Sequence, residues 1–265
     1  MNKNKVPKIG LALGSGGAKG LSHIGVIKFL VKNNIPINYI AGSSIGALIG
    51  GIYAVTQNIE EIENEVLNSN WKKIFSLLDP IFKGGLIGGK KVEKFVGKYT
   101  NQKTFNEINI KLKIIATDID TGNTVIIDKG NIATAIRASI SFPLLFKPIK
   151  INEKFLADGG LSMPVPVDVV KKMGANIVIA VNLDGSYFDK VNDSRKTKYY
   201  NTVNNSLNIL KYHLANYNIE NANIIVTPRT GNVSWSKFLD GKNTITAGEK
   251  AMAEKFNELK KLIDV

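Results

Sequence analysis

The chain has 265 residues, of which 44% are hydrophobic and 22% charged, the balance of a packed globular protein rather than of a disordered or collagen-like chain. It contains no cysteine, which excludes thiol catalysis, cysteine-ligated zinc and iron–sulfur clusters, and with only His23 and His213 a histidine-rich metal centre is not expected. The net charge of +13 favours polyanionic partners such as phospholipid membranes, nucleic acid or acidic substrates, although a solvated Lys- and Asn-rich surface explains it equally well.

The first predicted elements repeat one local pattern. An apolar strand, Lys8–Leu13, runs into the glycine-rich segment Gly14–Gly20, and apolar residues at helical spacing follow. A second strand, Asn38–Ala41, meets Gly42–Gly46, after which an apolar helix continues to Val55. Strand, glycine turn and helix in this order, twice over, predict a layered α/β fold.

The rest of the chain alternates helical and strand patterns without an internal repeat or a linker. We therefore expect one domain over residues 1–265, with core motifs in 8–183 and a C-terminal helix–strand–helix unit over 199–263 that packs on the same domain. The predicted helices are Ile59–Leu78 (one or two), Lys90–Tyr99, Ile132–Ser139, Val165–Met173, Tyr199–Asn216 and a basic amphipathic Thr244–Ile263. The predicted strands are Leu112–Thr117, Thr124–Asp128, a pair around Asn152–Glu153, Asn176–Asn182 and Asn223–Pro228, and the polar stretch 186–195 is predicted as a loop.

Targeting signals are not expected. The apolar run Ile9–Gly14 is too short for the core of a signal peptide. The longest apolar stretch, Ile40–Val55, contains two serines and is shorter than the ~18 residues of a membrane span, and the C-terminus has no lipidation motif. We expect a cytoplasmic protein that associates peripherally with the inner face of the membrane.

Ser44 occupies the nucleophile position of a G-x-S-x-G pattern, Gly42-Ser-Ser-Ile-Gly46. A serine on a sharp strand-to-helix turn needs small residues two positions before and after it. Its hydroxyl then lies at a helix N-terminus, where the macrodipole stabilises developing negative charge. The pattern alone also fits a plain Gly/Ser turn, but the strand before it and the apolar helix after it favour the catalytic interpretation.

The segment Gly14–Gly20 does not fit either nucleotide-binding pattern. The sixth position of G-x-G-x-x-G is Lys19, and a P-loop would need serine or threonine where Gly20 follows that lysine. An oxyanion hole of backbone N–H groups remains, beside the simpler alternative of a tight turn. Lys19 either adds positive charge to this turn or holds the loop.

A serine nucleophile needs a base, and several residues are candidates. His23 and His213 both lie within predicted helices, where a structural or surface role is the simpler interpretation. Asp158 ends an apolar strand just before two glycines, which places a carboxylate at the active-site edge of an α/β sheet. Asp118 and Asp120 also follow a strand, although turn capping explains them equally well.

Five motifs in a fixed order point to a known family. They are Leu13-Gly-Ser-Gly-Gly-Ala-Lys-Gly-Leu-Ser-His-Ile-Gly25, Ala41-Gly-Ser-Ser-Ile-Gly-Ala47, Ala116-Thr-Asp-Ile-Asp120, Arg137-Ala-Ser-Ile-Ser-Phe-Pro143 and Asp158-Gly-Gly160. From Lys8 to about residue 183 the chain resembles the bacterial patatin-like phospholipases, more closely the small single-domain branch related to the neuropathy-target-esterase catalytic domain.

The resemblance implies a three-layer α/β/α sandwich with a mostly parallel central sheet. It also implies a Ser–Asp dyad, with Ser44 as nucleophile and Asp158 as general base, so that no histidine is needed. The implied oxyanion hole uses the backbone amides of Gly16, Gly17 and Ala18. Ser15 stands where the family often has the first of three successive glycines, a departure that bears on the shape of the hole. The residues expected to support these motifs are Gly14, Lys19, Gly20, Gly42, Gly46, Gly159 and Gly160.

The function implied is that of a serine lipid acyl hydrolase without metal or cofactor. It would cleave carboxylic esters of phospholipids, lysophospholipids or simple fatty-acid esters through an acyl-enzyme. Because a carboxylate is a weaker base than imidazole, we expect burial to raise the pKa of Asp158. The apolar run Phe142–Phe146 is a candidate lining for the acyl chain or part of the core, and residues 82–103 are a candidate lid.

Three other functions remain as alternatives. An acyltransferase on a related fold would resemble G-H-S-x-G with a distant catalytic histidine, but Ser43 precedes the nucleophile here. A catalytically silent regulatory homologue would keep the fold without activity. Nucleic-acid binding is not expected, because the basic charge is scattered and no recognition pattern is present.

The lysines of the final helix (Lys250, Lys255, Lys260 and Lys261) fit transient attraction to anionic lipid.

Overall fold

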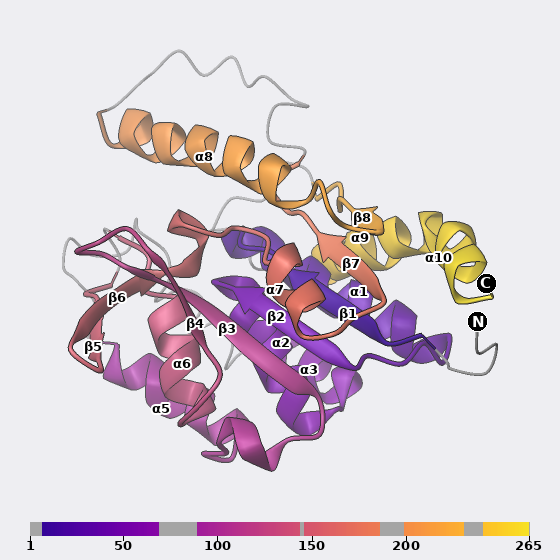
Figure 1. The fold of residues 1–265 in the computed structure, drawn as a ribbon, viewed down its shortest axis with the longest axis horizontal. Helices are drawn as coiled ribbons and strands as arrows, with labels where there is room; N and C mark the ends of the chain where they lie inside the picture. The colour runs from indigo at the N-terminus through magenta and orange to yellow at the C-terminus, as the bar shows by residue number, and fades with distance from the viewer. Residues whose placement is uncertain (1–6, 69–88, 144–145, 186–198, 231–240, 265) are drawn as a thin grey trace.

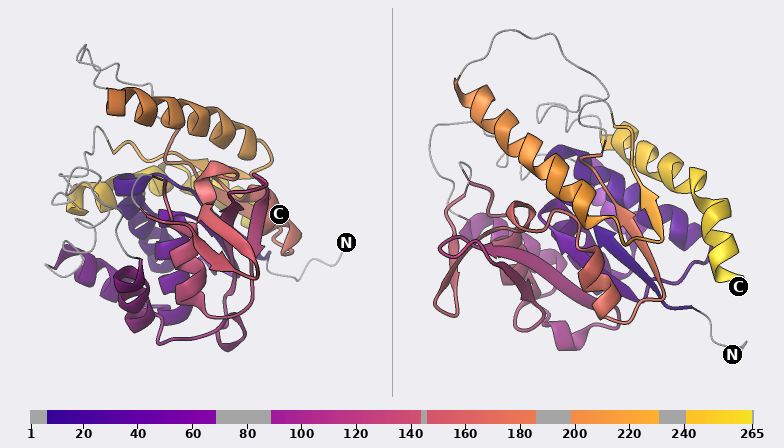
Figure 2. Two further views of the ribbon diagram at one scale, coloured as in Figure 1. Left: turned by 90° about the vertical axis from the view of Figure 1, so that its left-hand side faces the viewer. Right: turned by 45° about the horizontal axis from the view of Figure 1, so that its top comes forward.

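The computed structural model describes residues 7–68, 89–143, 146–185, 199–230 and 241–264, and the statements below refer to these residues. A twisted sheet lies between helices on its two faces (Figure 1). The views in Figure 2 show the same layers from the side and from above.

The elements have the following bounds. The strands are β1 (Ile9–Leu13), β2 (Tyr39–Ser43), β3 (Lys111–Asp118), β4 (Thr124–Ile127), β5 (Ile149–Ile151), β6 (Lys154–Asp158), β7 (Ile177–Val181) and β8 (Ile224–Val226). The α-helices are α1 (Ser22–Lys32), α2 (Ile45–Thr56), α3 (Ile59–Leu67), α5 (Lys90–Tyr99), α6 (Ile132–Ser139), α7 (Val167–Lys172), α8 (Tyr199–Asn218), α9 (Gly241–Glu254) and α10 (Phe256–Ile263). The short 3-10 helices are η1 (Gly17–Leu21), η2 (Phe105–Glu107) and η3 (Gly159–Leu161).

The strands hydrogen-bond in the order β5-β6-β3-β2-β1-β7-β8, with β4 paired to β3. Strands β3, β2, β1, β7 and β8 run parallel, whereas β4 and β6 are antiparallel to β3. The parallel strands therefore all end on one side of the sheet. We call this side the carboxyl edge, defined by the strand ends Leu13, Ser43, Asp118 and Val181, and the opposite side the amino edge.

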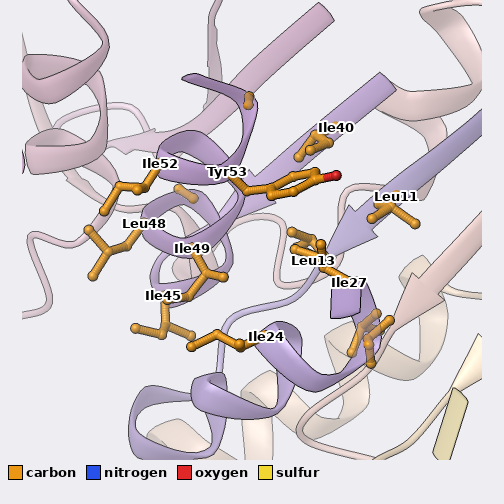
Figure 3. Packing of buried hydrophobic residues seen from close by; sticks show 14 of the residues in the cluster. Leu11, Leu13, Ile24, Ile27, Ile40, Ile45, Leu48, Ile49, Ile52 and Tyr53 are labelled. Atoms are coloured by element: carbon orange, nitrogen blue, oxygen red, sulfur yellow. The ribbon is translucent and has the colours of Figure 1, made fainter. Parts of the chain in front are cut away.

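The sheet is buried on both faces because its central strands are apolar on both. Along β1, Ile9, Leu11 and Leu13 face a large cluster formed with α1, α2 and α9, whereas Ala12 faces a second cluster on the side of α7. Figure 3 shows the first cluster, in which α1 and α2 pack side by side on β1 and β2. The expected three-layer α/β/α sandwich with a mostly parallel sheet is confirmed.

The predicted elements lie close to those observed, with one clear error. The sequence predicted a single helix over Thr244–Ile263, but the chain forms α9 and α10. The N–H of Lys255 donates to the carbonyl of Met252, three residues back, so the helical ladder is interrupted there. The new direction of α10 lets Phe256 pack edge-on against Phe29, with ring centroids 5.2 Å apart.

Four predictions fall wholly or partly on 69–88, 144–145 and 186–198, which lie outside the described residues. They are the C-terminal part of the helical stretch 59–78, residues 82–88 of the candidate lid 82–103, the middle of the apolar run Phe142–Phe146 and the loop 186–195. Within the described ranges, none of the helices combines the length and the apolar character needed to cross a bilayer.

Candidate active site

Ser44 and Asp158 meet because two strands share one edge of β3. Ile115 of β3 pairs with Ser43 at the end of β2, and the next residue, Ala116, pairs with Asp158 at the end of β6. Strand β4 pairs with both of these β3 residues as well, so it occupies the other edge. Strands β2 and β6 therefore lie end to end along the same edge of β3, and the C-terminal end of β2 faces the C-terminal end of β6. Ser44, the first residue after β2, faces the end of β6.

The backbone at Ser44 makes the sharp turn that the sequence predicts. Its φ of 54° and ψ of −121° lie in a region that residues with a side chain rarely adopt. A Cβ on Gly42 would lie 2.5 Å from the carbonyl oxygen of Gly46, and a Cβ on Gly46 would lie 2.1 Å from that of Leu13. The glycines of the G-x-S-x-G pattern are thus required by close backbone contacts on both sides of the serine.

The side chains of Ser44 and Asp158 form a direct hydrogen bond. The Oγ of Ser44 donates to Oδ2 of Asp158 at 2.5 Å, and Oδ1 of the same carboxyl accepts from the N–H of Gly160 at 2.8 Å. The N–H of Ser44 donates to Oγ of Ser139 at 2.9 Å. Each oxygen of the carboxyl therefore has a donor, and its orientation toward the serine is fixed.

Asp158 sits in an environment suited to a base. The residue is only 1% exposed. Burial raises the pKa of its carboxyl above the ordinary value, an effect that Lys211, the Ser44 hydroxyl and the Gly160 N–H partly oppose. The nearby Asp184 raises the pKa further. The expected burial of this carboxylate is therefore found, together with a raised affinity for a proton.

The glycine-rich loop after β1 packs against both partners of this hydrogen bond. A Cβ on Gly20 would lie 2.0 Å from the side chain of Ile45, and a Cβ on Gly160 would lie 2.8 Å from that of Ser15. Gly17 has a φ of 57°, which places the start of η1 in the left-handed region. The loop thus wraps around the serine turn and the turn that follows the carboxylate.

Backbone donors are present in this loop. The N–H of Lys19 donates to the carbonyl of Gly16 and closes the first turn of η1. The preceding N–H groups, those of Gly17 and Ala18, have no acceptor within the helix by geometry. Successive N–H groups at a helix start form a concave site for an anion, so the expected donors Gly16, Gly17 and Ala18 lie at a suitable helix start.

Three side-chain and backbone contacts hold the loop in place. His23 is fully buried, and its Nε2 lies 2.8 Å from the carbonyl oxygen of Gly14. Burial lowers the pKa of His23 to about 4, so the imidazole is neutral and donates this bond. The Nζ of Lys19 donates to the carbonyl of Leu183, and a Cβ on Gly16 would lie 2.5 Å from Leu183. Of the two roles considered for Lys19, holding the loop is the one for which a contact is present.

The other candidate residues lie elsewhere. Asp118 is buried, but its Oδ1 accepts from the N–H of Asp120, the turn capping weighed as the alternative, and its Oδ2 lies 3.9 Å from Nζ of Lys154. His213 is exposed on α8 with its ring against Tyr212. Across the described ranges, His, Asp and Glu side chains form no group of three that could hold a metal ion. Phe146 is buried in the core, the simpler of the two roles considered for it.

Three residues near the dyad were not singled out from the sequence. Ser139 accepts the hydrogen bond from the N–H of Ser44, and its place in the Arg-Ala-Ser-Ile-Ser motif was the available signal. Lys211 of α8 and Asp184 after β7 form a mostly buried ion pair of 3.7 Å that acts electrostatically on Asp158. No local pattern marks this pair, because its members are brought together only by the packing of α8.

Comparison with known proteins shows the family of this chain. The family model described as patatin-like phospholipase matches residues 11–171, which include Ser44 and Asp158. The chain belongs to the patatin-like phospholipase family. An uncharacterized NTE family protein of Mycobacterium tuberculosis is 36% identical over 181 residues, 68% of this chain and 50% of that protein. Lysophospholipase NTE1 of Candida albicans is 34% identical over 188 residues, 69% of this chain and 13% of that protein. This patatin-like chain thus spans half of the bacterial relative and a small part of the fungal one.

Solved structures share the patatin-like fold at low sequence identity. A chain of the ExoU–SpcU complex from the type III secretion system of Pseudomonas aeruginosa matches with a TM-score of 0.54 and 14% identity, covering 98% of this chain and 53% of that one. VipD from Legionella pneumophila matches with a TM-score of 0.50 and 14% identity, covering 94% and 67% of the two chains. At this identity the likeness concerns the fold alone.

Proposed function

We propose that this chain is a serine carboxylic ester hydrolase that acts on lipid esters, with Ser44 as nucleophile and Asp158 as general base. The observation that carries the proposal is the 2.5 Å hydrogen bond from the Ser44 hydroxyl to the buried Asp158 carboxylate at the end of a strained strand-to-helix turn. Membership of the patatin-like phospholipase family supports the reaction class.

In the first half of the reaction, Ser44 Oγ attacks the carbonyl carbon of the ester and its proton passes to Oδ2 of Asp158. The carbonyl oxygen becomes an oxyanion, which the N–H groups of Gly16, Gly17 and Ala18 stabilise at the start of η1. The bond between the carbonyl carbon and the alcohol oxygen then breaks. The alcohol leaves with the proton from Asp158, and the acyl group remains as an ester of Ser44.

The second half repeats these transfers with water. Asp158 takes a proton from a water molecule as the water oxygen attacks the acyl carbon, and the same donors hold the second oxyanion. The bond to Ser44 Oγ breaks, the serine recovers its proton from Asp158, and the carboxylic acid is released. The raised pKa of Asp158 suits it to hold the proton between these steps. A single carboxylate therefore performs every proton transfer.

We propose phospholipids, lysophospholipids or simple fatty-acid esters as the substrate class. The proposal draws on the family and on the fungal relative, which carries the name lysophospholipase.

Hydrolysis of a lysophospholipid and of a short soluble ester tests the proposal. We expect Ser44→Ala and Asp158→Asn each to abolish both activities, and Asp118→Asn, the same change at the buried rival carboxylate, to retain them. His213→Ala separates a hydrolase from a histidine-dependent acyltransferase, because only the latter would lose activity. Full activity in Asp158→Asn would exclude the assigned base.

A further inference from the structure

The β5–β6 hairpin projects past the carboxyl edge beside the dyad. Strand β6 pairs antiparallel with the last residues of β3, so that Leu156 lies opposite Asp118. Lys154 and Phe155 precede Leu156 in β6 and therefore lie beyond the end of β3. The turn at Asn152 and its strands extend from this edge, toward the left of Figure 1.

Helix α8 extends past the same edge. Near its C-terminus, Asn216 accepts a hydrogen bond from Asn182, which directly follows β7. One turn earlier, Lys211 forms its ion pair with Asp184, which lies further from the strand end. The preceding turns, from Leu210 back to the start of the helix, therefore overhang the edge. Figure 1 shows α8 crossing above the sheet toward the side where β6 lies.

Exposed apolar side chains gather on these two elements and on the β3–β4 hairpin beside them. Leu210 and Tyr217 of α8 are 67% and 69% exposed, and they lie seven residues apart on one helix face. Phe155 and Ile119, joined by a backbone hydrogen bond, are each 46% exposed. Among the described residues the full set of large exposed apolar side chains is Ile119, Ile126, Phe155, Ile209, Leu210, Tyr217, Val31 and Leu262.

The opposite, amino edge carries two of these eight. Val31 lies at the end of α1, which starts at the carboxyl edge and runs back, and Leu262 lies near the end of α10, whose Phe256 packs on α1. Figure 1 places α10 and the chain end at this amino edge, beside the start of β1. Docking through the lysines of α10 would therefore hold Ser44 at the side remote from the lipid.

The charge of the projecting hairpin fits an anionic surface. Its exposed residues include Lys147, Lys150 and Lys154, with Glu153 as the acidic residue of the hairpin. Lys150 is paired with Glu153 at 2.7 Å, and Nζ of Lys154 lies 3.9 Å from Oδ2 of Asp118 in β3. The whole chain has a net charge of +13. Exposed apolar side chains next to lysines are the combination that binds the interface of a bilayer containing anionic lipids.

We propose that the carboxyl edge is the membrane-docking surface of this chain, with α8 and the β5–β6 hairpin contacting a bilayer that contains anionic phospholipid. The inference rests on the proposed function, because it places the Ser44 turn against the source of its substrate. Leu210, Tyr217 and Phe155 enter the interfacial region, and the hairpin lysines bind lipid phosphates.

Cosedimentation of the full chain with vesicles tests this surface. The vesicles are equal parts phosphatidylcholine and phosphatidylglycerol, with pure phosphatidylcholine for comparison. We expect Leu210→Ser with Tyr217→Ser to weaken binding at least about tenfold. The control, Val31→Ser with Leu262→Ser, removes two apolar groups at the amino edge that are 41% and 38% exposed, and it should change binding less than about twofold.

A second pair of variants separates the two basic regions. Lys147→Ala with Lys150→Ala should weaken binding to the anionic vesicles by about tenfold or more, at roughly fivefold for each lysine near the surface. Lys250→Ala with Lys261→Ala removes the same charge from α9 and α10 and should have little effect. All four variants should react with a soluble fluorophosphonate at the wild-type rate, which shows that they are folded.

Several results would overturn the proposal. Loss of binding in the amino-edge controls but not in the edge variants would place the docking surface on the other side. A wild-type chain that reacts with the fluorophosphonate but binds no vesicles would refute docking while leaving the proposed function intact. A Leu210–Tyr217 variant that changes the oligomeric state and not vesicle binding would show that a second copy covers α8. Failure of the wild type to react with the fluorophosphonate would instead count against the proposed function.

Discussion

Replacing Ser44 by glycine should make the protein more stable than replacing it by alanine. Both changes remove the nucleophile and its hydrogen bond to Asp158, so these losses cancel in the comparison. What differs is the backbone, because the φ of 54° and ψ of −121° at this residue are strained for alanine and permitted for glycine. The comparison therefore isolates the strain stored in the turn.

The size of the difference follows from two opposing effects. Strain in a sparsely populated backbone region amounts to about 1–3 kcal/mol. Glycine loses roughly 0.5–1 kcal/mol more than alanine in conformational entropy on folding. The net advantage of Ser44→Gly over Ser44→Ala is thus about 1–2 kcal/mol, which for a chain of this size corresponds to roughly 2–8 °C in the melting temperature.

Urea unfolding and thermal melting of the two variants measure this difference. Ala247→Gly in the middle of α9 is the control, because there glycine should cost about 1 kcal/mol relative to alanine. Equal stabilities for the two Ser44 variants would limit the strain to the roughly 0.5–1 kcal/mol that glycine costs in entropy, and a glycine variant less stable by that amount would show that the turn holds no strain in solution. The latter result would contradict the strained backbone conformation assigned to Ser44.

Three further predictions concern the dyad and its supporting loop. Because burial raises the pKa of Asp158, kcat/KM should fall in acid with a midpoint above the ordinary pKa of aspartate. Lys211→Met removes a nearby positive charge and should therefore move that midpoint to a still higher pH. An unchanged midpoint would contradict the electrostatic role of Lys211. A carboxyl whose pKa is higher in the folded than in the unfolded protein contributes to stability at a pH below its pKa in the unfolded state. This contribution is lost as the pH rises through its pKa in the folded state. Asp158→Asn should therefore be more stable than wild type at pH 7 in urea unfolding, and the gain should shrink as the pH falls through the folded pKa toward the unfolded value of about 3.9; a loss at pH 7 would refute this. His23→Leu removes the donor to the Gly14 carbonyl and should lower kcat by up to about 100-fold with little change in KM, whereas His23→Gln should recover part of the rate; equal rates for the two variants would exclude the positioning role. With its pKa lowered to about 4, His23 should add no inflection to the pH profile near neutrality.

Local patterns were sufficient to predict the first half of the site. The apolar strand, the glycine turn and the helix around Ser44 each follow from residues close in sequence, and the contacts of Gly42 and Gly46 give the physical reason for the spacing. The same holds for the layered fold, because β1 and β7 are apolar on both faces and therefore need helices packed on each face of the sheet. Asp158 was a candidate because it ends a strand before two glycines, but Asp118 and Asp120 also follow a strand, and the family resemblance was needed to choose among them.

Long-range arrangement could not be predicted in the same way. The dyad depends on β2 and β6 sharing one edge of β3, and this register is set by pairing between segments that are far apart in the sequence. The interruption at Lys255 was missed because the amphipathic pattern continues through it, and the packing of Phe256 on Phe29 decides the new direction. The Lys211–Asp184 pair has no sequence signal, because only the position of α8 brings it to the site.

The intact mass of the protein after treatment with a fluorophosphonate tests the assignment of Ser44 and Asp158. We expect a single adduct on the wild type, no adduct on Ser44→Ala, and slow labelling of Asp158→Asn, because Asp158 accepts the proton of the Ser44 hydroxyl in the 2.5 Å hydrogen bond. An unlabelled wild type, or an adduct that persists in Ser44→Ala, would contradict the assignment of the nucleophile. Labelling of Asp158→Asn at the wild-type rate would contradict the assignment of the base.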